Sequence, residues 1–313
     1  MSKSIKITCC QVPKFNSPSL SAILTSLNKN IDSFTVVNLL QKFLPYEEAV
    51  RQYGILSGKV ETLTSLPLSF NVAFATALVP AITVAKTSGD MQKGVKRISF
   101  SLLTTIIIVL PCVVGMVVFA EPILKLLFPN ASQGAFIMQI CVLATIFTAM
   151  EQTINGALQG LGKVMVPAMA LTIGVLSKLI LNLILVPIPT DVFPLGGATG
   201  AAFATDVCHF IAFWISFSVL KRTINIKFSF NKMVIKPLIA SLIMAVVSYG
   251  AYILLNSIIA PKMATIIALL IAVIVYVIAV FILKIFNEED ILMLPAGDKI
   301  YSILLKLGIY KQK

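Results

Sequence analysis

Charged side chains are scarce in this sequence. Asp, Glu, Lys and Arg together supply 12% of its 313 residues, whereas hydrophobic residues supply 58%, and the mean hydropathy is +0.96. A soluble domain has about 25% charged and roughly 45–50% apolar residues. The composition therefore excludes an ordinary soluble globular domain.

The motifs of common enzymes are also missing. The sequence contains no P-loop GxxxxGK[ST], so it should not hydrolyse ATP itself, and it contains neither HExxH nor GxSxG. No DxD-like acidic pair stands in an aqueous loop to hold a metal-bound sugar nucleotide, and no glycine-rich re-entrant loop resembles a selectivity filter. We therefore expect no enzymatic activity, no cofactor and no metal site.

The five cysteines have no spacing typical of a disulfide framework. Cys112, Cys141 and Cys208 fall in apolar stretches, where a small buried hydrophobe is the usual role of cysteine. Cys9 and Cys10 are adjacent, without a CxxC or Cys/His pattern around them. We expect neither a disulfide nor metal ligation from any of them.

Long apolar segments, by contrast, fill most of the chain. Each is long enough to cross about 30 Å of hydrocarbon as a helix. They fall at about 19–40, 62–85, 98–119, 135–157, 164–186, 197–220, 236–256 and 263–283. The sequence therefore predicts an all-α polytopic membrane protein with about eight transmembrane helices.

The positive charges lie mainly on one side of the predicted spans. Alternate connections, together with the N-terminal segment and the C-terminal tail, hold 17 Lys and Arg residues, whereas the other four loops hold five. Cytoplasmic loops are enriched in Lys and Arg, so both termini are predicted to be cytoplasmic. The net charge of +12 is thus a signal of membrane topology, and we expect no nucleic-acid partner.

The predicted spans fall into two populations. The last two are almost wholly Leu, Ile, Val and Ala, whereas the first six carry polar residues at depth. A charge at mid-bilayer costs about 2.5–3.5 kcal/mol, so such residues should face a bundle interior or a water-filled cavity. The candidates for a cavity or substrate-facing position are Lys29, Asp32, Asn38, Glu61, Glu151, Lys178, Asp206 and His209. We expect a six-helix bundle with a polar interior and two appended apolar helices.

Spacing suggests contacts between some candidates but leaves their roles open. Lys29 and Asp32 are three residues apart, share a helix face and can pair. That pair either makes a polar helix tolerable in lipid or forms a cavity wall for an anionic or sugar-rich substrate. Glu151 and Lys178, on consecutive spans, are candidates for an ion pair between helices, and Glu61 is either a solvated flank or a gate.

Two further features bear on helix packing and on function. Asp206 and His209, three apart, have the ingredients of a proton relay or cation site, although hydrogen-bonded packing is the simpler interpretation. Pro111 lies inside a predicted span, where proline removes a backbone hydrogen bond that neighbours or water must replace.

The tail after residue 284 has helical amphipathic spacing. Its apolar positions are Ile300, Ile303, Leu304, Leu307 and Ile309. This pattern predicts a helix that lies on the inner membrane surface, with a simple solvated tail as the alternative.

Four stretches carry a resemblance to a known family. They are NIDSFTVV from residue 30, YGILSGKVETL from 53, LPLSFNVAFATALVP from 66 and LQGLGK at 158–163. Over roughly residues 18–313 the chain resembles the polysaccharide-biosynthesis branch of the MOP exporter superfamily, and within it the stage V sporulation protein B (SpoVB)-like group. Members of that branch have two six-helix lobes around a central cavity and two extra helices. They resemble flippases for undecaprenyl-linked saccharides, including peptidoglycan precursor.

The resemblance implies an organisation for the whole chain. It gives a divergent N-terminal segment at 1–17, a six-helix transporter lobe at 18–232, two additional apolar helices at 233–284 and an amphipathic cytoplasmic tail at 285–313. These would correspond to the second lobe and the extra pair, without the first lobe. The implied partners are an undecaprenyl-type lipid-linked saccharide, the lipid bilayer, and either a missing N-terminal lobe or a second copy.

The expected function is that of the C-terminal part of a flippase for lipid-linked oligosaccharide or peptidoglycan precursor, in cell-envelope polysaccharide biosynthesis or sporulation. It should be inactive alone and lie in a bacterial plasma membrane. Two alternatives stay open: a MATE-like drug/cation antiporter fragment, which Asp206 and His209 favour, and a non-transporting membrane scaffold.

Overall fold

The computed structural model describes residues 31–224, 229–292 and 297–306, and the described residues are helical apart from turns and short connections. Lys29, Cys9 and Cys10 lie outside these ranges, as does the predicted segment 1–17. The predicted pair between Lys29 and Asp32 therefore has one member outside the described residues.

Seven helices within the described ranges are long and apolar enough to cross a membrane. They contain or form α3 (Glu61–Thr87), α4 (Met91–Val118), α6 (Ala135–Gly160), α7 (Met165–Leu185), α8 (Gly197–Thr223), α9 (Lys236–Asn256) and α10 (Pro261–Ile282). The predicted span at 19–40 begins outside the described residues and continues as the shorter apolar helix Ile31–Leu40. The protein is thus a multi-pass helical membrane protein, as the composition predicts.

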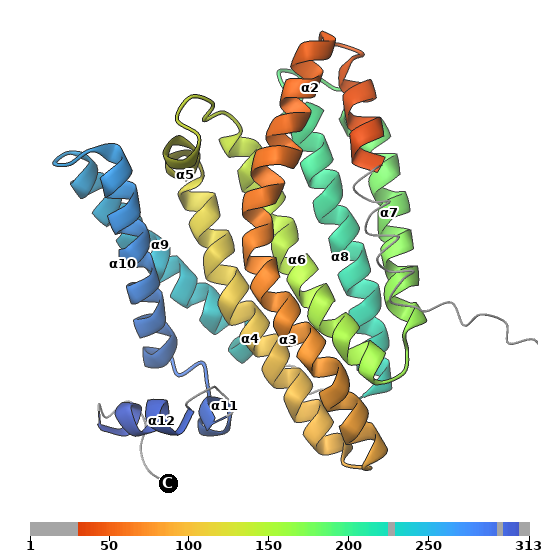
Figure 1. The fold of residues 1–313 in the computed structure, drawn as a ribbon, viewed down its shortest axis with the longest axis vertical. Coiled ribbons are helices and arrows are strands. Elements are labelled where there is room, and N and C mark those ends of the chain that lie inside the picture. The colour runs from red at the N-terminus through yellow and green to blue at the C-terminus, as the bar shows by residue number, and fades with distance from the viewer. Residues whose placement is uncertain (1–30, 225–228, 293–296, 307–313) are drawn as a thin grey trace, which may run out of the picture.

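The segment 41–61, which lies between the first two predicted spans, is largely helical. Helix α2 (Tyr46–Gly54) runs through a π-helical turn, η1 (Ile55–Val60), directly into α3 (Figure 1). Ile55 and Leu56 are buried in a cluster with the short helix α5 (Ala120–Leu127). Because this apolar face has a packing partner, the chain stays helical despite its two glycines.

Close helix approach in the bundle depends on small residues. A Cβ added at Gly156 of α6 would lie 2.4 Å from the carbonyl oxygen of Ala75 in α3. A Cβ at Gly174 of α7 would lie 2.6 Å from the carbonyl oxygen of Cys208 in α8. Helices in membranes pack through such small residues because lipid supplies little hydrophobic driving force between them.

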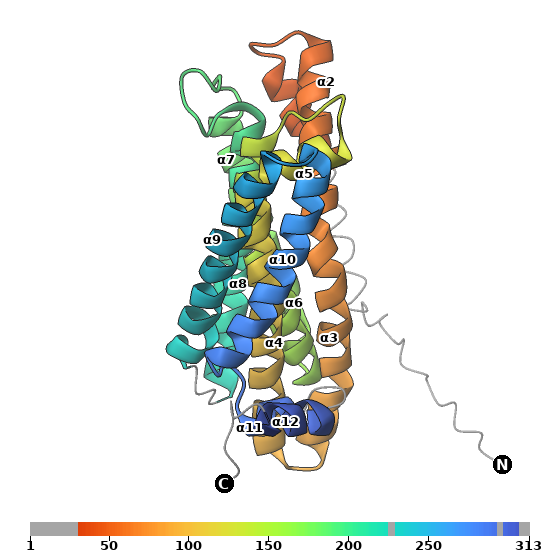
Figure 2. The ribbon, with the colours of Figure 1, turned by 90° about the vertical axis from the view of Figure 1, so that its left-hand side faces the viewer.

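Helices α9 and α10 form a separate pair that rests against α4 (Figure 2). Their buried positions are mostly small, including Ala240, Ala245, Ala264, Ala268 and Ala272. Their exposed positions are large and apolar, including Val246, Leu254, Leu270, Val273 and Ile282. The pair therefore packs through a seam of small residues and presents its large apolar side chains outward.

A hydrogen bond from α10 to α4 joins this pair to the bundle beside a proline in α4. Pro111 lies inside α4 and has no N–H to donate to the carbonyl of Ile107, four residues earlier. The hydroxyl of Tyr276 in α10 donates to that carbonyl at 2.7 Å, and Tyr276 is buried. A side chain from a neighbouring helix thus replaces the backbone bond that proline removes.

The tail lies at one end of the spans. Helices α11 (Glu288–Leu292) and α12 (Gly297–Lys306) run across the same end as the α3–α4 and α6–α7 turns (Figures 1 and 2). The predicted helical tail is present over the described residues, while Leu307 and Ile309 lie outside them.

Candidate functional site

A polar cavity of about 390 Å³ lies among the helices of the bundle. Its lining comes from helix Ile31–Leu40 and from α3, α6, α7 and α8. The charged and amide-bearing side chains on its wall are Asp32, Glu61, Glu151, Gln152, Asn155, Gln159, Lys178 and His209. Five of the eight sequence-predicted candidates therefore line one space, although they come from segments far apart in the chain.

One wall of the cavity is a buried ion pair. The Nζ of Lys178 in α7 donates to Oδ2 of Asp32, and Nδ2 of Asn182 donates to Oδ1 of the same carboxylate at 3.3 Å. Asp32 is 5% exposed and Lys178 1% exposed. Because each charge has a partner, burial of the pair costs far less than burial of either charge alone. The contact fixes helix Ile31–Leu40 against α7, and sequence spacing did not single it out.

Another part of the wall carries a second acidic group with a different partner. Nδ1 of His209 in α8 lies 3.1 Å from Oε2 of Glu151 in α6, and Nδ2 of Asn155 donates to Oε1 of Glu151 at 3.4 Å. Glu151 is buried, and His209 is partly exposed. The contact is an ion pair only when the imidazole is protonated, and otherwise it is a hydrogen bond.

Asn155 also contributes an oxygen without a protein partner. Its Oδ1 is buried and has no hydrogen-bond partner among the described residues. A buried carbonyl oxygen that lines a cavity needs a donor from water or a ligand. The cavity can therefore accept a hydrogen-bonding guest.

The remaining candidates occupy different positions. Asp206 is buried, but it is not part of the cavity lining, and its Oδ1 has no hydrogen-bond partner in the described part of the chain. Asn38 lies on an exposed face and donates to the carbonyl of Phe34 at 2.7 Å within its own helix. Glu61 lines the cavity at the start of α3, two residues after Lys59, whose Nζ donates to the carbonyl of Ala131 at 2.6 Å.

Sequence reasoning missed a polar network next to the cavity. Nδ2 of Asn71 in α3 donates to the carbonyl of Ala149 at 2.8 Å and to Oε1 of Gln152 at 3.1 Å. Thr105 of α4 donates to Oδ1 of Asn71 at 2.7 Å, and its hydroxyl lies 2.8 Å from that of Thr153 in α6. The network joins three helices. In the sequence, this network is indicated by Asn71, the one Asn within the apolar stretch LPLSFNVAFATALVP.

The described residues contain no group of three or more His, Cys, Asp or Glu side chains that could hold a metal ion. The site is thus an internal polar cavity with paired charges in an apolar helical bundle. The fold and site together define a polytopic membrane protein with a place for a polar guest inside its bundle.

Comparison with known proteins agrees with this class. A family model described as MatE matches residues 58–184. Uncharacterized membrane protein YabM of Bacillus subtilis is 26% identical over 293 residues, covering 86% of this chain and 53% of YabM. Lipid II flippase MurJ of Bacillus subtilis is 29% identical over 178 residues, covering 54% of this chain and 30% of MurJ. Stage V sporulation protein B of Bacillus subtilis is 26% identical over 212 residues, covering 65% of this chain and 39% of that protein.

A solved structure has the same fold. The inward closed conformation of a lipid II flippase MurJ matches with a TM-score of 0.58 and 22% sequence identity, covering 86% of this chain and 52% of that chain. Residues 58–184 match the MatE model, and the sequence similarity to lipid II flippase MurJ and to stage V sporulation protein B agrees with the predicted resemblance to the SpoVB-like group. The chain spans about half the length, or less, of the curated relatives described above.

Proposed function

We propose that this chain is the C-terminal part of a flippase for lipid-linked saccharides that serves cell-envelope polysaccharide biosynthesis. The observation that carries the proposal is the charged cavity, because most of its lining lies within residues 58–184, which match the MatE model. Relatives that are flippases support a transport role over catalysis.

The candidate residues have different roles in this proposal. Asp32 and Lys178 hold two helices together at the cavity wall, because each charge is neutralised by the other in their ion pair. Glu151, His209 and Glu61 face the cavity and are the proposed contacts for polar groups of the guest. A sugar or phosphate presents many donors and acceptors, and such a wall can replace the water that they lose.

We further propose that transport requires a second lobe. A transporter of this kind exposes its site to one side at a time by rocking one bundle against another. The chain supplies one bundle with a cavity, an appended pair and a tail, and it spans about half of the relatives' length. The second body is either a separately encoded N-terminal lobe or another copy of this chain.

Reconstitution tests the proposal directly. The purified chain in proteoliposomes should not translocate a fluorescent undecaprenyl-linked saccharide while it is monomeric, and adding a matching N-terminal lobe should start translocation. The Glu151→Gln variant should then lower the rate, while an exchange of Lys125, whose side chain on α5 is exposed, should not. Robust translocation by the demonstrably monomeric chain would refute the need for a second lobe.

The proposed location is a bacterial plasma membrane with both termini in the cytoplasm. Its support is the Lys and Arg asymmetry and the membrane-protein relatives. In a background without native cysteines, single cysteines at 88–94 and 224–230 should be labelled only from the cytoplasm, and those at 128–132 and 188–192 from outside. Labelling of the first group from outside would overturn this orientation.

The same vesicles separate the two alternatives. The Glu151–His209 contact is the observation behind a drug/cation antiporter as a second candidate, because a carboxylate beside an imidazole on a cavity wall offers a place for a cation. An antiporter would move a cationic dye against a pH gradient and leave the lipid-linked saccharide in place. A membrane scaffold would move neither, even with the second lobe present.

A further inference from the structure

A second, larger cavity lies at the end of the molecule where the tail folds back. It has a volume of about 790 Å³ and opens between the first turns of α4, the last turn of α8, the π-helical turn η2 (Asn231–Ile235) and α11. Its polar lining residues are Gln92, Lys96, Ser99, Thr223, Ser229, Lys232 and Asp290. No sequence pattern indicates this cavity, and the proposed transport function does not use it.

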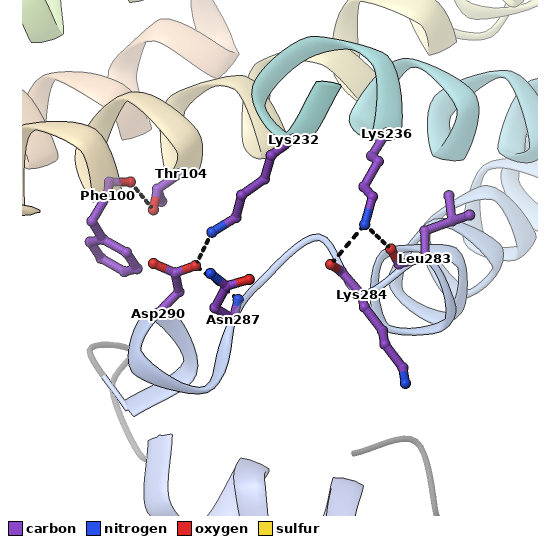
Figure 3. A network of polar contacts seen from close by, with 8 residues as sticks. All are labelled: Phe100, Thr104, Lys232, Lys236, Leu283, Lys284, Asn287 and Asp290. Carbon is purple, nitrogen blue, oxygen red and sulfur yellow. Dashed lines mark hydrogen bonds and ion pairs between the residues drawn. The ribbon is translucent and has the colours of Figure 1, made fainter. Parts of the chain in front are cut away.

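An acidic side chain from the tail occupies one corner of the cavity (Figure 3). Oδ2 of Asp290 lies 2.5 Å from Nζ of Lys232 and accepts the backbone N–H of Asn287 at 2.8 Å. The side chains of Lys232 and Asp290 are 26% and 17% exposed. A lysine thus already binds an anionic oxygen here, in a place that water and solutes reach.

Lys236, four residues after Lys232, makes different hydrogen bonds. Nζ of Lys236 donates to the carbonyls of Leu283 at 3.0 Å and Lys284 at 3.3 Å, at the C-terminal end of α10 (Figure 3). Backbone carbonyls at a helix end cannot move away without unwinding the helix. Asp290, by contrast, lies on a short tail helix, so another anion can replace its carboxylate on Lys232.

The rest of the lining is apolar. Phe100 and Leu103 of α4 and Met233 of η2 form part of the wall, while Lys96 and Ser99 lie on the same first turns of α4. A cavity with lysines beside an apolar wall, at the end of membrane-spanning helices, matches a ligand with an anionic head and an apolar tail. A soluble anion without an acyl chain would make no favourable apolar contact with this wall.

We propose that this cavity binds the phosphate of an anionic phospholipid, with Lys232 and Lys96 as its cationic contacts and the wall around Phe100 against the start of an acyl chain. Asp290 takes the place of the phosphate when the lipid is absent. The cytoplasmic leaflet is rich in anionic lipids, and each Lys or Arg near its surface contributes about 1 kcal/mol of attraction. Lipid and tail therefore compete for Lys232.

The test uses the full chain, purified in a neutral detergent. It is titrated with phosphatidylglycerol, with phosphatidylcholine of the same acyl chains, and with inorganic phosphate. Bound lipid is counted by native mass spectrometry. Phosphatidylglycerol should be retained in preference to phosphatidylcholine, and inorganic phosphate at millimolar concentration should displace little of it.

Three variants locate the site. Lys96→Gln should weaken phosphatidylglycerol binding about fivefold, the effect of one lost lysine contact. Asp290→Asn should strengthen binding by a similar factor, because it removes the competing charge and keeps an oxygen for the N–H of Asn287. Lys93→Gln is the matched control: it removes the same charge from the same helix, but its side chain is 76% exposed, paired with Asp90 and absent from the lining.

Each outcome either supports or overturns the proposed lipid site. Opposite shifts for Lys96→Gln and Asp290→Asn, with Lys93→Gln unchanged, support the lipid site. Equal retention of the two lipids, or all three variants behaving alike, would overturn it. Saturation by inorganic phosphate alone, with loss of the lipid, would make this a soluble-anion site and would also overturn the proposal.

Discussion

The bundle and the α9–α10 pair cross the same membrane but are held together by different interactions. The bundle contains a buried ion pair, a Glu–His contact and a polar network that joins three helices. The pair packs through alanines and rests against α4 through apolar contacts, with a hydrogen bond from the Tyr276 hydroxyl to the carbonyl of Ile107. Polar contacts in lipid are specific and costly to break, whereas packing of small residues tolerates change at lipid-facing positions.

This difference indicates what each region is for. A bundle built only to pass through lipid needs no buried charge, as α9 and α10 demonstrate. Asp32, Glu151 and Lys178 all line the cavity of the bundle, and we propose that they are retained for it. The comparison leads to four predictions, from the largest expected effect to the smallest.

The largest effect is expected from breaking the buried ion pair. Lys178→Met leaves the carboxylate of Asp32 buried without a cation, which costs about 3–5 kcal/mol of unfolding free energy. Denaturant unfolding in detergent micelles measures the loss. Asp32→Asn added to the same protein should recover most of it. The control Lys125→Met breaks an exposed pair with Glu121 and should change stability little; equal losses for the two lysines would contradict the assignment.

The next effect concerns helix approach in the two regions. Gly156→Ala places a Cβ 2.4 Å from the carbonyl oxygen of Ala75, so α3 and α6 must move apart, at a cost of about 1–3 kcal/mol. Gly250→Ala in α9 meets nothing within 4 Å and should be neutral or slightly stabilising. Thermal unfolding of both variants checks the contrast. A neutral Gly156→Ala would show that the bundle is packed less tightly than the structure indicates.

A smaller effect is expected where the two regions meet. Tyr276→Phe leaves the carbonyl of Ile107 without the donor that compensates for Pro111, and should lower stability by about 1 kcal/mol. The half-exposed Tyr249 on α9 provides the control, because its change to Phe removes a hydroxyl from the same pair outside this contact. If Pro111→Ala is introduced first, the Tyr276 effect should shrink, since the backbone can then satisfy Ile107.

The smallest effect lies outside the membrane-spanning part. The Lys93 side chain, followed by its backbone N–H, lowers the pKa of the Asp90 carboxyl, which caps the N-terminus of α4. A lowered pKa in the folded state means that the stabilisation is present above the unfolded pKa and is lost as pH falls through the folded value. Thermal midpoints of wild type and Asp90→Ala should therefore differ at neutral pH and converge in acid. A difference that persists in acid would assign the effect to something other than the charge.

Several structural features could be read from the sequence with little ambiguity. Predicted spans such as 135–157 and 164–186 lie within a few residues of α6 and α7, because a run of about 20 apolar residues has few alternatives in a membrane. The helices within segment 41–61 could not be predicted in the same way, because they depend on packing against α5, which local sequence does not report.

The site residues also show which features the sequence predicts and which features depend on the tertiary structure. The sequence by itself determined that Asp32, Glu151 and Lys178 should avoid lipid, since any charged side chain exposed to hydrocarbon is costly, whichever residue it later pairs with. Only the tertiary structure decided that Lys178 pairs with Asp32 and Glu151 with His209. Those choices depend on the rotation and contact of helices far apart in the chain, and residue spacing carries that information only within one helix.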